Sequence, residues 1–197
     1  MAEGSVGKHN VGRIAERIVA NELEFRGFRV SDLNKDGVSA NADLLAVKEG
    51  RAWQIQVKGA SYEKGYADGW WFNYGYCSEE MIKDNSLTLF NRANSFYWAQ
   101  VIILVCVKSP RDYHCAVLPI EIAERAARMN LDYAFRTVKK DNTPKRPGKM
   151  WVTYDYLPRK TRPLEKRASM EEELALIRPF FDNWDLDSIT NGLPVSR

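Results

Sequence analysis

Apolar residues recur at helical spacing near the start of the chain. Between residues 11 and 26 they fall on one face of a helix, at Ile14, Ala15, Ile18, Val19, Leu23 and Phe25. Gly27 follows as a natural C-terminal stop. Glu16 lies at the border of the apolar arc, roughly 200° from Ile14 on a helical wheel. The pattern predicts an amphipathic helix whose border carboxylate reaches around the edge of the surface on which the helix packs.

The residues that follow alternate between apolar and polar types, as strands do. The sequence predicts a first strand at 28–33, a polar loop at 34–41, and two strands at 42–47 and 52–58. Glu49 and Gly50 join the last two strands as a hairpin turn. The third strand has one apolar and one polar side, which are Trp53, Ile55 and Val57, and Gln54, Gln56 and Lys58. We expect the apolar side to pack on the first helix.

Two more strands and a helix are predicted further along the chain. Residues 96–107 form a near-continuous apolar run, typical of a strand buried on both faces. Residues 113–120 predict another strand, and a helix opens just after Pro119 and runs to about residue 130. This order of elements indicates an α/β domain, on the border of α+β, with a mixed β-sheet flanked by helices.

The chain beyond residue 131 is polar and rich in proline, and a helix is predicted near 170–181. We interpret residues 1–130 as the core domain and 131–197 as a C-terminal extension packed on it. Residues 136–167 carry eleven Lys or Arg against three Asp or Glu, a net charge of +8, in a protein whose overall charge is +3. Residues 171–187 carry a net charge of −5. The basic stretch favours contact with a polyanion, and a solvated loop beside an acidic helix is the alternative.

The composition is that of a globular protein, with 45% hydrophobic residues in a chain of 197. Cys77, Cys106 and Cys115 are an odd number at unpaired spacings, and the last two lie in apolar runs. This indicates buried thiols in a reducing compartment rather than disulfides or a zinc site. The first residues lack the apolar centre of a signal peptide, and the longest apolar run is about half a membrane span. We expect a cytoplasmic protein without a membrane segment.

Polar residues with a recognisable spacing converge on the predicted hairpin. Asp43 opens its first strand, and Gln56 and Lys58 end its second, so strand pairing places Asp43 and Gln56 at the same end of the sheet. With Glu16 on the preceding helix, this arrangement resembles the PD-(D/E)XK nuclease superfamily. In that family a helix supplies a Glu, one strand an Asp, and the next strand an acidic residue, any residue and a Lys. The resemblance covers roughly residues 10–60, with weaker support through about residue 130.

The resemblance implies a restriction-endonuclease-like fold and a catalytic set of Glu16, Asp43, Gln56 and Lys58. Asp43 would be the central ligand of Mg²⁺, for which Mn²⁺ can substitute, together with the side-chain carbonyl of Gln56 and the backbone carbonyl of Val57. Glu16 would complete the metal site directly or through water. Lys58 would orient or help deprotonate the attacking water and balance charge on the phosphate.

The sequence departs from the family pattern at two positions. Ala42 replaces the usual Pro before the Asp, which costs little. Gln56 replaces the acidic residue, and its amide oxygen is a metal ligand without a charge. The side chains of the site then total −1 instead of −2, so weaker metal affinity, or fewer bound ions, is expected.

An aromatic segment follows Lys58. Its members are Tyr62, Tyr66, Trp70, Trp71, Phe72, Tyr74 and Tyr76. Such rings belong to a core or a subunit interface more often than to a base-stacking surface, so we favour a structural role, with some tyrosine hydroxyls facing a substrate. The candidate phosphate contacts lie in the basic stretch, at Lys139, Lys140, Lys145, Arg146, Arg159 and Lys160.

These observations favour a metal-dependent endonuclease that cuts duplex DNA. Two cuts in a duplex need two active sites, which favours a homodimer or a higher homo-oligomer. The basic and aromatic additions favour a sequence-specific enzyme of the restriction or homing type. The alternatives are a structure-specific nuclease resembling Holliday-junction resolvases, and a non-catalytic nucleic-acid-binding protein on the same fold. An interaction domain whose acidic segment meets a basic partner is a further alternative.

Overall fold

The computed structural model of the chain describes residues 8–33, 42–62, 69–73, 99–109, 111–136, 149–152 and 164–190. Its helices are α1 (Lys8–Phe25), α3 (Ile120–Arg136), α4 (Leu164–Ile177) and α5 (Leu186–Thr190), with the 3₁₀ helix η2 (Arg178–Phe180). Its strands are β1 (Arg29–Asp32), β2 (Leu44–Lys48), β3 (Arg51–Ser61), β4 (Trp70–Asn73), β5 (Val101–Ser109), β6 (Asp112–Pro119) and β7 (Lys149–Val152).

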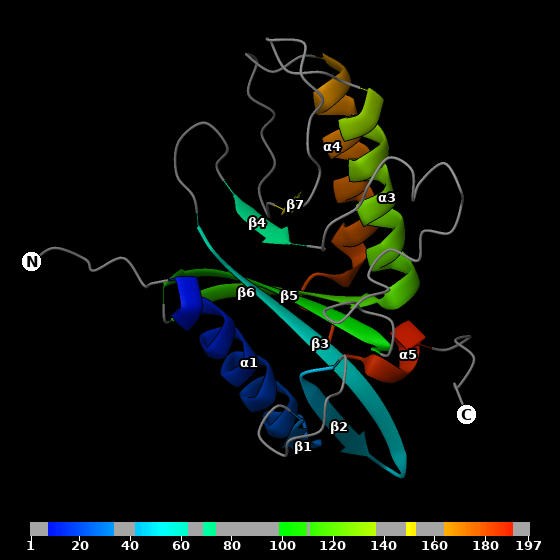
Figure 1. The fold of residues 1–197 in the computed structure, drawn as a ribbon. Coiled ribbons are helices and arrows are strands. Elements are labelled where there is room, and N and C mark those ends of the chain that lie inside the picture. Colours follow the sequence, from blue (N-terminus) through cyan, green and yellow to red (C-terminus); the bar gives the residue numbers. More distant parts are fainter. Residues whose placement is uncertain are drawn as a thin grey trace, which may run out of the picture.

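A five-stranded sheet in the order β1-β2-β3-β5-β6 forms the centre of the fold (Figure 1). Only the β3–β5 pair in this sheet is parallel, and the other three pairs are antiparallel. The strands β4 and β7 pair separately as a two-stranded antiparallel ladder. Helix α1 lies on one side of the large sheet, and α3 and α4 lie on the other (Figure 1). The predicted mixed β-sheet flanked by helices is confirmed.

Helix α1 covers one face of the sheet through its apolar side. Ala15, Val19 and Leu23 are fully buried. They share a hydrophobic cluster with the apolar side chains of β3, namely Trp53, Ile55 and Val57, as predicted. The helix ends where the sequence indicates, because Gly27 adopts a φ of +82°. Its N–H donates to Glu24 O and the N–H of Phe28 donates to Leu23 O, which is a Schellman-type C-cap.

The hairpin turn between β2 and β3 also has the predicted position. Glu49 and Gly50 both have a positive φ, of 50° and 77°. Positive φ at both central residues is the signature of a type I′ turn, whose twist matches that of the paired strands. The turn fixes the register in which Leu44 faces Ile55, and this register determines which residue of β3 lies opposite Asp43.

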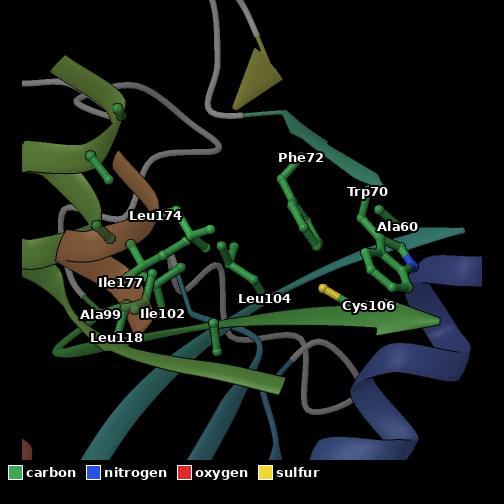
Figure 2. Close-up of a cluster of buried hydrophobic side chains, with 14 of the residues drawn as sticks. Ala60, Trp70, Phe72, Ala99, Ile102, Leu104, Cys106, Leu118, Leu174 and Ile177 are labelled. Atoms are coloured by element: carbon green, nitrogen blue, oxygen red, sulfur yellow. The ribbon is translucent and has the colours of Figure 1, made fainter. Parts of the chain in front are cut away.

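A second hydrophobic cluster covers the opposite face of the sheet. Ile102 and Leu104 of β5 meet Leu174 and Ile177 of α4, and Phe72 of β4 joins them (Figure 2). The first six residues of β5 are all buried, which confirms the prediction of a strand enclosed on both faces. The polar side of β3 is therefore solvated only in part, because Gln56 is buried and Lys58 is half-buried while Gln54 is exposed.

The C-terminal residues contribute to both hydrophobic clusters. After α4 and η2, the chain crosses the edge of the sheet beside β6, where the N–H of Asp182 donates to Cys115 O at 2.7 Å. Trp184 and Leu186 then reach the cluster beneath α1. The predicted division at residue 130 falls inside α3, and the separation into a core and an extension stays a prediction. The helix predicted near 170–181 is present as α4, which begins and ends earlier.

Two of the three cysteines lie in the described part of the chain. Cys106 and Cys115 are buried and unoxidised, as predicted, and burial raises the pKa of both thiols. Cys77 lies outside the described residues. Within the described ranges, none of the helices is long and apolar enough to cross a membrane.

Tyr113 of β6, which contacts α1, is predicted to make the stability of the fold decrease at high pH. The Tyr113 hydroxyl donates to Glu22 Oε1 at 2.8 Å. This hydrogen bond, together with burial and the charge of Glu22, raises the pKa of Tyr113 from 10.0 to about 12. A group whose pKa is raised on folding stabilises the fold fully below its unfolded pKa, and the stabilisation is lost as pH rises through the folded pKa.

We therefore expect Tyr113→Phe to lower the free energy of unfolding at neutral pH. The difference from wild type should shrink between pH 10 and about 12, where wild type loses the contribution of this phenol. Urea unfolding of both proteins at neutral pH and at about pH 12 measures the difference. A gap that stays constant over this range would show that the Tyr113–Glu22 hydrogen bond does not carry the effect.

Candidate functional site

The candidate site lies where β3 runs past the end of β2. The paired register of these strands stops at Leu44 and Ile55, and the remaining residues of β3 continue beyond it. Asp43 occupies the next position. Its N–H donates to Ile55 O at 2.8 Å, and its Oδ2 accepts from the N–H of Val57 at 2.7 Å. The carboxylate is thereby fixed beside the strand at the point where the ladder ends.

Gln56 lies beside Asp43 on the face of the sheet that α3 and α4 cover. Its register partner in β5 is Ile102, a member of that hydrophobic cluster. The side chain is only 5% exposed, and its Oε1 finds no hydrogen-bond partner among the described residues. A buried polar atom without a partner lowers the stability of the fold by about 1–3 kcal/mol, so a ligand that bonds to this oxygen would stabilise the protein. A hard cation, or water bound to one, would satisfy it.

Lys58 is half-buried two residues further along the same side of β3. Burial lowers the pKa of its amine, and the carboxylates of Asp43 and Glu16 act in the opposite direction. The amine is therefore within electrostatic reach of both acids. A lysine whose pKa is lowered is easier to use as a proton acceptor at neutral pH than an ordinary one.

Glu16 comes from the other side of the sheet, on α1. It follows the fully buried Ala15 and is itself partly exposed, as expected for a residue at the border of the apolar face. Its charge raises the pKa of Lys58, so Glu16 lies within electrostatic reach of that amine. Its partial exposure is that of a border residue, and its role in the site stays a prediction.

The backbone carbonyl of Val57 points to the same edge. In an extended strand the N–H and C=O of one residue face the same neighbour, and the N–H of Val57 faces Asp43. Asp43, Gln56, Val57 and Lys58 thus lie along β3 where the ladder with β2 has ended and the ladder with β5 continues, and Glu16 acts on Lys58 through its charge. Their individual roles stay predictions.

This donor set fits a hard divalent cation. It offers a carboxylate fixed beside the strand, an amide oxygen in need of a partner, a backbone carbonyl and a second carboxylate, all of them oxygen ligands of the kind that Mg²⁺ takes. Within the described ranges, no group of three or more His, Cys, Asp or Glu gathers that would serve as an alternative metal site. The site itself contains two acids, and its third ligand is the neutral Gln56.

The other predicted contact residues are only partly placed. Lys139, Lys140, Lys145, Arg146, Arg159 and Lys160 lie outside the described residues, as do Tyr66, Tyr74 and Tyr76. Trp70 and Phe72 are buried in the cluster beneath α3 and α4, and Tyr62 packs edge-on against Trp70. The Trp70 Nε1–H donates to Val107 O. Tyr62, Trp70 and Phe72 therefore have the structural role that the sequence favours, and Trp71 is half-buried.

Sequence reasoning missed one residue of this region. Gly59 follows Lys58 directly and lies beneath α1, where an added Cβ would meet Ala15 Cβ at 2.6 Å. A glycine inside a strand pattern is a recognised sign of close approach by another part of the backbone, and that signal is present in the sequence.

The chain was compared with known families, curated proteins and solved structures. No protein-family model matches the sequence, and no curated protein matches it. Among solved structures, the fold is similar to that of a bacterial homing endonuclease, I-Ssp6803I. The likeness covers 85% of this chain and 95% of that chain, with 12% sequence identity and a TM-score of 0.48. Because this level of similarity does not identify a family, the function has to be inferred from the residues of the site.

Proposed function

We propose that the protein is a metal-dependent endonuclease of the PD-(D/E)XK type that hydrolyses phosphodiester bonds of DNA. The observation that supports it most is the buried Gln56 Oε1, which has no hydrogen-bond partner among the described residues and belongs to the neighbour of Val57, whose N–H donates to Asp43. In the same place, Lys58 has a lowered pKa and two acidic neighbours. This combination suits a site that binds a cation and accepts a proton from water.

In this proposal each residue has a distinct task. Asp43, Gln56 and Val57 would hold Mg²⁺ or Mn²⁺ through oxygen atoms, and Glu16 would complete the set. The ion, when bound, polarises the phosphate and stabilises the charge that develops on it. Asp43 is held in place by the Val57 N–H, so it presents its carboxylate without having to reorganise. Lys58 would orient the attacking water and accept its proton as the water oxygen bonds to phosphorus, while the bond from phosphorus to the leaving ester oxygen breaks and solvent protonates that oxygen.

The substrate is proposed to be duplex DNA, cut at specific sequences by a homodimer or a higher homo-oligomer in the cytoplasm. Two-fold symmetry would place one site at each strand. The residues Lys139, Lys140, Lys145, Arg146, Arg159 and Lys160 would contact phosphates. Each such contact makes binding more sensitive to salt, so DNA affinity should fall steeply as the salt concentration rises.

One observation favours a second candidate function. The third ligand position holds the neutral Gln56 rather than an acid, so the site would have less charge with which to hold an ion. A nucleic-acid-binding protein that uses this fold without cutting DNA is therefore a second candidate function. A nuclease specific for branched DNA is a further alternative.

Cleavage of two substrates by the purified protein tests these functions. Plasmid DNA and a four-way junction are each incubated with Mg²⁺, Mn²⁺ or EDTA. The proposal expects metal-dependent cutting of the plasmid into discrete bands and no cutting in EDTA. Cutting of the junction alone would indicate a structure-specific nuclease. Salt-sensitive binding of both DNAs without cutting would indicate a binding protein. A protein that does not bind or cut either DNA would have none of these three functions.

A further inference from the structure

Helix α1 lies closely against strand β3 at Gly59. A Cβ placed on Gly59 would lie 2.6 Å from Ala15 Cβ and 2.8 Å from the backbone oxygen of Val11. Real Cβ atoms do not approach other atoms this closely, so any larger residue at this position would displace the helix. Val11 and Ala15 are both buried, so this turn of α1 lies directly on the strand.

The close approach, and not the backbone conformation, explains the glycine. The φ of Gly59 lies outside the left-handed region that favours glycine, which Gly27 and Gly50 do occupy. Glycine at such a position is otherwise unfavourable in a strand, because it leaves no side chain to pack and costs more conformational entropy than other residues. What the position requires is the absence of a Cβ.

The turn of α1 that rests on Gly59 is the turn that carries Glu16. Glu16 follows Ala15 directly, and an outward shift of this turn would withdraw its carboxylate from the strand edge. Lys58, which Glu16 influences electrostatically, precedes Gly59 directly. The contact therefore joins the part of α1 and the part of β3 that supply the site.

We propose that Gly59 is a positioning residue for Glu16. By having no side chain, it lets α1 settle close enough to β3 for the Glu16 carboxylate to reach around the strand edge to Asp43 and Lys58. The inference rests on the proposed function in taking Glu16 as part of the metal site. It assigns the contact between Gly59 and Ala15 a role in metal binding in addition to its role in packing.

The test compares Gly59→Ala with Gly12→Ala by titrating the metal-free proteins with Mn²⁺ in a calorimeter. Gly12 lies on the same helix, and an added Cβ there meets nothing within 4 Å, so Gly12→Ala is a matched control. Residues that orient metal ligands typically change metal affinity by about 10- to 100-fold when they are replaced. We expect a loss of about tenfold or more for Gly59→Ala and no loss for Gly12→Ala.

A double-mutant cycle separates positioning from general damage to the fold. If Gly59 acts through Glu16, Gly59→Ala should weaken Mn²⁺ binding in the wild-type background and add nothing in a Glu16→Gln background. Equal losses in both backgrounds would overturn the role. Removing the Ala15 methyl group by Ala15→Gly should restore part of the affinity of Gly59→Ala, and it gives a second folded variant if Gly59→Ala is unstable.

The outcomes also separate this inference from the proposed function. If wild type binds Mn²⁺ and cuts DNA, and Gly59→Ala binds Mn²⁺ with equal affinity, only the role of Gly59 is overturned. A wild-type protein that neither binds Mn²⁺ nor cuts DNA would overturn the proposed function and this role with it.

Discussion

Replacing Lys58 with alanine is expected to lower metal-dependent DNA cleavage by about 10³-fold while leaving the affinities for Mn²⁺ and for DNA close to those of wild type. Lys58 offers no oxygen to a cation, so its loss should not remove the ion. Its half-buried amine, with a lowered pKa, is the group of the site best suited to take a proton from water. The rate should fall because that proton transfer is lost.

Asp43→Ala should produce a different pattern from Lys58→Ala. Asp43 is the central ligand in the proposed site, so its replacement is expected to abolish both Mn²⁺ binding and cleavage. It also removes the acceptor of the Val57 N–H at the end of the ladder. Single-turnover cleavage, calorimetric Mn²⁺ binding and salt-dependent DNA binding, measured on both variants, distinguish the two residues.

Lys108→Ala serves as the matched control for the lysine. Lys108 is exposed at the end of β5, where it forms a surface ion pair with Asp112. Such pairs contribute little to stability, so this variant should cut and bind like wild type. A Lys58→Ala protein that cuts at the wild-type rate would remove the lysine from the mechanism, and one that loses Mn²⁺ would instead give it a structural role.

Local patterns in the sequence predicted most of the elements that build the site. The apolar spacing of α1, the Glu49–Gly50 turn and the alternation along β3 each depend on neighbouring residues, so they can be read without knowledge of the rest of the chain. Together they placed Asp43 and Gln56 at one end of a hairpin and Glu16 at the border of a helix.

What the sequence did not predict depends on contacts between distant residues. Gln56 is buried on the face of the sheet against which α4, more than a hundred residues later, packs. The four-residue strands β4 and β7 are too short to give a clear alternation, and each is defined by the other. The fit of α1 onto Gly59 appears only when helix and strand are placed together, although the lone glycine in the strand was a usable signal.

The burial of Gln56 leads to the second large prediction, for Gln56→Glu. In EDTA we expect this variant to be about 2–4 kcal/mol less stable than wild type, because it places a carboxylate in a buried position beside Asp43 without a cation to balance it. Urea unfolding at neutral pH in EDTA measures the change.

Adding a divalent cation should offset most of this destabilisation. The extra charge is expected to raise the affinity for Mg²⁺ by about ten- to a hundredfold. Binding to the folded state alone stabilises it by mass action, so the variant should gain more stability from Mg²⁺ than wild type does. Unfolding curves at increasing Mg²⁺ concentrations, together with calorimetric binding, test this coupling.

Gln54→Glu is the matched control for Gln56→Glu. Gln54 lies two residues earlier on the same side of β3, but it is exposed, so its replacement introduces the same charge into water. It should change stability by less than about 0.5 kcal/mol, with or without Mg²⁺. If Gln56→Glu behaves like Gln54→Glu in both conditions, Gln56 is not a ligand of a metal site, and the proposed nuclease loses its main support. A destabilised variant rescued by Mg²⁺ would place a cation beside the side chain at position 56.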